Sequence, residues 1–136
     1  MLSRYFNVTG FNNMKPELKM KYLLKVEEIF LFLLSIFLFS RLEISWWWFP
    51  ALLFVPDIGM VGYFSNNRVG AIVYNVVHHR AISISFYIIG AIVFSQIIQL
   101  IGIILFAHST LDRVFNFGLK YPDNFKHTHL SESWII

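Results

Sequence analysis

The 136-residue sequence contains no cysteine, which excludes disulfide bonds, thiolate nucleophiles and cysteine-held iron–sulfur clusters. Charged residues are also scarce, at 14% of the chain, whereas 57% of the residues are hydrophobic and 18% are aromatic. A soluble domain of this length cannot bury so large an apolar fraction. The composition therefore predicts that part of the protein surface faces lipid.

Long stretches of the chain carry no charge, as in 29–40 and 81–111. A helix needs about 20 apolar residues to cross a hydrocarbon core of about 30 Å. Strands of a membrane barrel would alternate apolar and polar residues, which these stretches do not. We therefore predict an all-α fold with cytoplasmic tails at 1–20 and 118–136 and a polytopic transmembrane domain at 21–117, its four helices covering about 21–40, 46–64, 69–94 and 96–115.

Short polar segments mark the turns between these helices. Residues 65–68 form a polar turn, and Gly118 is the expected stop of the last helix. The apolar stretch 69–115 is more than twice as long as one crossing, so it must fold as two helices in a tight hairpin. The polar pair Ser95 and Gln96 is the expected break.

The basic residues predict the orientation in the membrane. On the side of the bundle opposite the termini, Arg41 is the only basic residue. The tryptophans at 46–48 also lie on that side, and their rings favour the headgroup level. The positive-inside rule then places both termini in the cytoplasm of a multi-pass protein of the bacterial inner membrane. The residues that carry this prediction, near both termini and the middle turn, are Arg4, Lys15, Lys19, Lys21, Lys25, Arg68, Arg113, Lys120 and Lys126.

The net charge of +3 does not indicate a nucleic-acid-binding protein, because most basic residues flank the apolar stretches. The expected partner is the lipid bilayer. A membrane-protein partner or a second copy of the chain is the other class of partner that such a protein can have.

Ionisable side chains fall inside the predicted helices, where each costs about 2.5–3.5 kcal/mol unless it has a partner or a purpose. Glu27, Asp57, His78 and His108 come from separate helices and lie at a similar depth, about 6–14 Å inside the cytoplasmic boundary. Asp112 is four residues from His108 and therefore on the same helix face. The sequence thus predicts one polar layer that four helices share.

Carboxylates and imidazoles from separate helices bind zinc, manganese or iron in proteins without cysteine ligands. We therefore predict a site for one of these divalent metals, with zinc as the default because it lowers the pKa of bound water. Asp57 and Glu27 are the candidate catalytic residues, acting as ligand and general base. The predicted ligands are His78, His108, Asp112, Asp57 and Glu27.

The neighbours of these residues have other expected roles. His79 lies about 100° and Arg80 about 200° round the helix from His78, so both are expected outside the site. Gly59 and Gly62, beside Asp57, would let a neighbouring helix approach closely.

Three functions are consistent with such a polar layer. The first is a membrane-embedded metal-dependent hydrolase that acts on a lipid. The second is an accessory or scaffold subunit whose polar residues only fix the register of the helices. The third is a proton- or ion-translocating protein that uses the same carboxylates as a relay. Retained metal, a co-purifying partner and a pH-dependent flux would distinguish them.

Four strings carry a resemblance to a known family: VPDIGMVGYF, GAIVYNVVH, HSTLDRVFNFGLKYP and FKHTHL. Together they resemble, over about 23–130, a small bacterial membrane family known as domain of unknown function forty-two-sixty. The chain departs from the family pattern at Gly59, Asn116, Phe117 and Ser131. The resemblance implies a fold but no activity, and it singles out Glu27, Asp57, Tyr63, Asn75, His78, His108, Asp112, Arg113, Lys120, Tyr121 and His129.

Overall fold

The computed structural model describes residues 8–131, and the outer parts of the two predicted tails, with Arg4, lie outside these residues. The all-α prediction is confirmed, since the described residues form helices and only an isolated β-bridge between Lys120 and Thr128. The elements are α1 (Val8–Asn12), α2 (Pro16–Ser40), α3 (Trp48–Leu52), the 3-10 helix η2 (Val55–Phe64), α4 (Asn67–His78), α5 (Arg80–Ile92) and α6 (Gln96–Val114).

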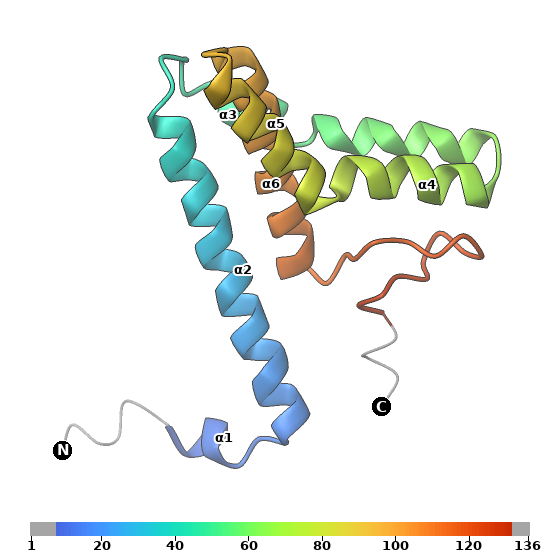
Figure 1. The fold of residues 1–136 in the computed structure, drawn as a ribbon. Coiled ribbons are helices and arrows are strands. Elements are labelled where there is room, and N and C mark those ends of the chain that lie inside the picture. Colours follow the sequence, from blue (N-terminus) through green and yellow to red (C-terminus); the bar gives the residue numbers. More distant parts are fainter. Residues whose placement is uncertain (1–7, 132–136) are drawn as a thin grey trace.

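The helices form an upright group and a side arm (Figure 1). Helices α2, α5 and α6 run steeply beside one another, and α3 packs near their upper end. The 3-10 helix η2 and helix α4 form an antiparallel pair that extends sideways from α6, on the side opposite α2. We call this pair the side arm.

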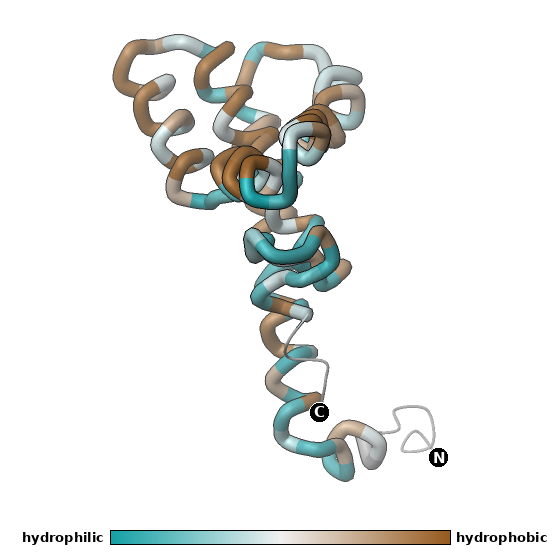
Figure 2. Tube along the Cα trace, turned by 90° about the vertical axis from the view of Figure 1, so that its right-hand side faces the viewer, coloured by the Kyte–Doolittle hydropathy of each residue, from teal (hydrophilic) through white to brown (hydrophobic). Residues whose placement is uncertain are grey.

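Helix α1 lies at the lower end of α2, whereas the described chain ends below the side arm (Figure 1). At the upper end, the loop after α2 meets the turn between α5 and α6, where the Glu43 amide donates a hydrogen bond to Gln96 Oε1 at 2.8 Å. Hydrophobic residues gather in the upper part of the molecule, whereas the lower part is mostly hydrophilic (Figure 2). The polarity therefore changes along the axis of the upright helices.

A small aromatic and aliphatic core joins α2, α3 and α6. The rings of Phe39 and Phe49 meet edge to face, with centroids 5.2 Å apart. Burial of such side chains contributes about 25 cal/mol per Å² of apolar surface. The buried members of this core are Phe39, Phe49, Leu53, Ile103, Ile104 and Ala107.

The continuous helix predicted over 46–64 is wrong, because the chain forms the short α3 and then η2. Pro56 lies at the start of η2. Proline has no amide hydrogen to donate and keeps the preceding residue out of the α-helical region, so α3 cannot continue through it. The chain turns here and leaves the upright group.

The single helix predicted over 69–94 is also wrong, because it is divided into α4 and α5 at His79. The His79 backbone is extended, with φ −82° and ψ 120°, and its Nδ1 accepts a hydrogen bond from the Ala81 amide at 3.3 Å. An accepting side chain before the first turn is the usual cap of a new helix. The break lets α4 lie in the side arm while α5 runs up beside α6.

The predicted break at Ser95 is confirmed, and the hairpin of α5 and α6 forms there. Phe94 adopts the left-handed conformation, with φ 56°, and the Ser95 amide returns to the Gly90 carbonyl at 2.8 Å. The stop predicted at Gly118 comes earlier, at Asn116, whose φ is 66°. The Phe117 amide reaches the Asp112 carbonyl at 2.8 Å, which ends the helix with a Schellman motif.

Glycines allow close contacts in both helix pairs. The predicted close approach at Gly62 is confirmed, since a Cβ there would lie 3.1 Å from the Gly70 Cα atom. A Cβ at Gly102 of α6 would lie 2.5 Å from the Tyr87 backbone nitrogen and 2.6 Å from the Ser83 carbonyl oxygen of α5. Small residues at such crossings are typical of helices that pack in membranes.

Among residues 8–131, α6 is the one helix that is both long and apolar enough to cross a bilayer. Large apolar side chains are also exposed elsewhere, including Phe30 at 66%, Trp47 at 83%, Phe64 at 92% and Ile92 at 69%. Exposed apolar surface of this extent marks a membrane or protein contact.

We expect Gly102→Ala to destabilise the fold strongly, because its methyl group would press on the α5 backbone, which cannot rotate away. Overpacking of this kind costs about 1–3 kcal/mol. Thermal unfolding in detergent measures the change. Gly10→Ala is the matched control, since a Cβ at Gly10 meets nothing within 4 Å. Equal melting temperatures for the two variants would contradict this packing of α5 on α6.

Candidate metal centre

Four of the five predicted ligands come together where the side arm joins α6. One ligand atom from each of Asp57, His78, His108 and Asp112 lies within 4.8 Å of the others. His108 Nε2 is 3.2 Å from Asp57 Oδ1 and 3.5 Å from Asp112 Oδ2. His78 Nε2 is 3.9 Å and 3.4 Å from the same two oxygens. We call these residues the four-ligand cluster.

Both imidazoles are held by backbone carbonyl groups. His78 Nδ1 lies 2.8 Å from the Tyr74 carbonyl oxygen, and His108 Nδ1 lies 2.8 Å from the Leu53 carbonyl oxygen. A carbonyl only accepts, so each Nδ1 must carry the proton and donate it. The neutral ring then has a lone pair on Nε2, which is the tautomer that a metal-binding histidine shows when its second nitrogen donates to the backbone.

The two Nε2 atoms are buried and have no hydrogen-bond partner among the described residues. The histidine side chains are only 3% and 2% exposed, whereas Asp112 is 19% and Asp57 41% exposed. Two imidazole lone pairs and two carboxylates thus face one another without a donor between them. Such a set of acceptors could hold a cation at its centre.

The spacing of the four atoms fits a tetrahedral metal ion. Bonds of 2.0–2.2 Å to imidazole nitrogen and carboxylate oxygen separate neighbouring ligand atoms by about 3.3–3.6 Å in a tetrahedron. The four nitrogen–oxygen distances of the cluster run from 3.2 to 3.9 Å. Because the four ligand atoms all lie within 4.8 Å of one another, the side chains need to draw closer together to bind such an ion.

Tyr74 supports two members of the cluster, and sequence analysis did not identify it. Its hydroxyl donates a hydrogen bond to Asp112 Oδ2 at 3.0 Å, and its ring stacks on His78 with centroids 3.7 Å apart and planes 12° apart. Tyr74 is four residues before His78, a spacing that puts both rings on one helix face and could have indicated its role from the sequence.

Glu27, predicted as a ligand and general base, does not join the cluster. It is exposed on α2, which packs on the side of α6 opposite the side arm (Figure 1). Its neighbour Glu28 accepts a hydrogen bond from Arg80 Nη2, so Arg80 pairs away from His78, as predicted. The predicted facing of Glu27 is therefore wrong, because its side of α2 does not meet the cluster.

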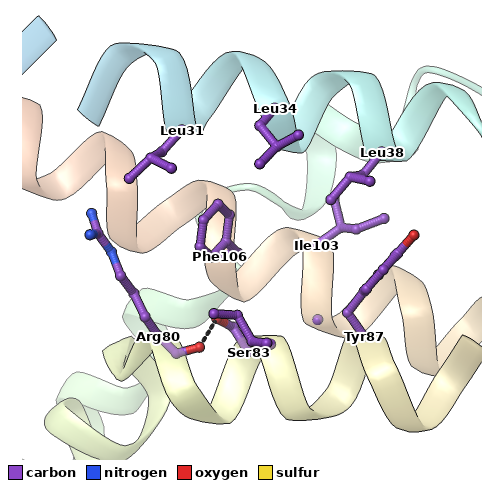
Figure 3. A pocket seen from close by; sticks show the side chains of 10 residues that line it. Leu31, Leu34, Leu38, Arg80, Ser83, Tyr87, Ile103 and Phe106 are labelled. Atoms are coloured by element: carbon purple, nitrogen blue, oxygen red, sulfur yellow. Dashed lines mark hydrogen bonds between the residues drawn. The ribbon is translucent and has the colours of Figure 1, made fainter. Parts of the chain in front are cut away.

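Arg80 also lies at one end of an apolar cavity of about 450 Å³ between α2, α5 and α6. Figure 3 shows leucines of α2 facing Ser83 and Tyr87 of α5 across this cavity. The Ser83 hydroxyl donates to the Arg80 carbonyl oxygen, so it is satisfied within its own helix. The cavity is separate from the four-ligand cluster.

His79 lies outside the cluster, as predicted, and so does His127. His79 is exposed and caps α5. His127 lies 2.7 Å from Asp123 through Nδ1, in the segment after α6, and this hydrogen bond lowers the pKa of the Asp123 carboxyl. Neither residue belongs to the cluster.

The segment 118–131 folds back onto the side arm instead of extending into solvent. Asn75 fixes it, because its amide group donates to the Lys120 carbonyl oxygen at 2.8 Å and accepts from the Lys120 amide at 2.7 Å. The Lys120 ammonium donates to the Phe125 carbonyl at 2.9 Å and lies 4.7 Å from the Tyr74 ring centroid. Burial lowers the pKa of Lys120. The segment therefore supports Tyr74 from behind.

The remaining residues of the family pattern also hold this segment. The Tyr63 ring packs edge on against Phe125 at 5.0 Å, and Tyr121 lies 4.3 Å from the His127 ring. His129 Nδ1 accepts from the Leu119 amide at 2.9 Å, and burial lowers the pKa of His129. These residues shape the surroundings of the cluster without contacting its four ligand atoms.

The sequence profile described as "Domain of unknown function (DUF4260)" matches residues 21–133. The chain belongs to this family. No curated protein and no solved structure matches the chain. The DUF4260 region includes the four-ligand cluster, Tyr74 and the segment 118–131, so the site lies within the part of the chain that defines the family.

We expect Asn75→Leu to loosen the segment 118–131, because it leaves the amide and carbonyl of Lys120 unpaired. Each unpaired buried group costs about 1–3 kcal/mol, so the two groups together should change local opening more than tenfold. Trypsin cleavage after the exposed Lys126 measures this opening. Val76→Leu, on the exposed face of α4, is the control. Unchanged cleavage in Asn75→Leu would show that the segment is held by other contacts.

Proposed function

We propose that the protein binds a divalent metal ion at a site within a membrane. The ligands of this site are Asp57, His78, His108 and Asp112. The observation that carries this proposal is the convergence of two buried, unpartnered Nε2 atoms on two carboxylates. Zinc suits the set best, because two imidazoles and two carboxylates at tetrahedral spacing are ligands that it prefers. Manganese and iron accept the same donor atoms.

We propose hydrolysis of a lipid ester as the reaction. A divalent metal lowers the pKa of a bound water and polarises an ester carbonyl. Asp57, the most exposed of the four ligand side chains at 41%, would accept the proton of the attacking water. The water oxygen bonds to the carbonyl carbon, the ester C–O bond breaks, and the departing alcohol takes a proton. Water and ester give acid and alcohol.

The bilayer placement that we propose follows the upright helices. Helix α6, at 19 residues and about 1.5 Å each, measures about 28 Å, close to the thickness of the hydrocarbon core. The chain enters this layer in four segments, α2, residues 41–54, α5 and α6, of which α2 and α6 have the length to cross it. The side arm lies in the cytoplasmic leaflet, its apolar face toward lipid and its other face under the segment 118–131.

Both termini are cytoplasmic in this proposal, and the membrane is the bacterial inner membrane. Single cysteines at Asn13, Ser45 and Lys126 test it, because the native chain has no cysteine and all three positions are exposed. We expect a membrane-impermeant maleimide to label intact cells only at position 45. Labelling at 13 or 126 from outside would reverse the orientation, and labelling of all three without cell lysis would contradict the bilayer placement.

We expect the protein purified without chelator to hold about one divalent metal ion per chain. Both His78→Ala and His108→Ala should lose it, because each removes a ligand. Tyr74→Phe should weaken binding about 10–100-fold, since loss of a supporting hydrogen bond has that effect on metal sites. His79→Ala and His127→Ala are matched controls that should retain the metal. Elemental analysis and competition with a chromogenic chelator measure both quantities.

A protein that is metal-free, takes up no zinc, manganese or iron and is unaffected by chelator would contradict the metal centre. The four acceptors would then have to share protons, which is the proton-relay function, or serve as structural contacts of a scaffold subunit. A pH-dependent flux in vesicles distinguishes those two.

A further inference from the structure

We propose that an apolar groove beside the four-ligand cluster binds the acyl chain of a membrane lipid and presents its polar head to Asp57. This inference rests on the proposed metal centre and names its substrate class. The groove has a volume of about 530 Å³, within the 300–1,000 Å³ of small-molecule sites. Its walls come from both the side arm and α6, and they include Val55, Ile58, Gly59, Val77, Ile101 and Leu105.

Three chain segments carry residues of both the groove and the cluster. Ile58 follows Asp57 directly, and Val77 precedes His78. On α6, the groove residues Ile101 and Leu105 are spaced with His108 at i, i+4 and i+7, which places all three on one helix face. A chain lying in the groove along α6 therefore ends at the layer of the metal ligands.

The opposite side of the cluster is closed by the segment after α6. The cleft there, which Tyr74, His78, Arg113, Gly118 and Leu119 line, has only about 10 Å³ of free space. That volume holds one water molecule at most. A substrate larger than water must therefore reach the cluster from the side of Asp57, whose side chain is the most exposed of the four ligands at 41%.

The rim of the groove is apolar and exposed, with Val55 at 44%, Ile58 at 65% and Ile97 at 70%. In the proposed bilayer placement this rim opens sideways into the acyl layer of the membrane. A divalent cation at the inner end attracts a carboxylate, phosphate or ester oxygen. Apolar walls with a cation at one end match an amphiphile, and they do not match a polar peptide or a nucleotide.

Photo-cross-linking with diazirine-labelled stearic acid tests this inference in the full-length protein in lipid nanodiscs. We expect mass spectrometry to find the label concentrated on residues 52–59 and 97–105. Ile101→Trp, which fills the groove, should reduce labelling there at least fivefold, and Val55→Trp should do so from the opposite wall. Ile92→Trp, equally apolar and more exposed at 69% but outside the groove, is the matched control.

The cavity in Figure 3 supplies an internal control, since labelling around Leu31 and Leu34 should not respond to either groove variant. Chelator should reduce labelling of the groove in the metal-loaded protein, because the carboxylate of stearic acid then has no metal ion to bind. Label spread evenly over α2 and α5, or unchanged by Ile101→Trp and Val55→Trp, would overturn the inference while leaving the metal centre intact. Focused groove labelling in a protein without metal would support chain binding and contradict the proposed function instead.

Discussion

The structure depends on one electrostatic constraint, the meeting of four hydrogen-bond acceptors in a buried place. The backbone carbonyls of Tyr74 and Leu53 accept hydrogen bonds from the Nδ1 atoms of the two histidines. Both Nε2 lone pairs therefore point at carboxylates. An unpartnered buried polar atom costs about 1–3 kcal/mol, and converging acceptors also repel one another. A cation bound among these acceptors would offset this cost.

The unusual parts of the fold follow from bringing these acceptors together. Pro56 lies where η2 begins, so that Asp57 belongs to the side arm. The break at His79 ends α4 beside α6, with His78 in the last turn of α4. A simple bundle of four upright helices would not hold both residues against His108 in this way. Behind them, the segment 118–131 presses Lys120 against Tyr74, which fixes the orientation of the His78 ring.

The sequence allowed a correct prediction of every member of the cluster but not of the path that assembles it. Charges and imidazoles inside apolar stretches are conspicuous, which is why Asp57, His78, His108 and Asp112 could be identified. Hydropathy does not distinguish an upright helix from one lying in the side arm, so the breaks at Pro56 and His79 were missed. Glu27 was misplaced because α2 is apolar on nearly all sides, and its contact face depends on tertiary packing.

X-ray absorption spectroscopy at the zinc edge of the purified, zinc-loaded protein tests directly whether His78 and His108 bind the metal. The account predicts a shell of four to five nitrogen and oxygen ligands at about 2.0–2.2 Å, with the outer-shell scattering of two imidazole rings. In His108→Ala, which loses a ligand and with it the metal, this zinc spectrum should be absent. A spectrum with oxygen ligands only and no imidazole scattering would show a hydrated ion held at the surface, and it would contradict a metal centre built from His78 and His108.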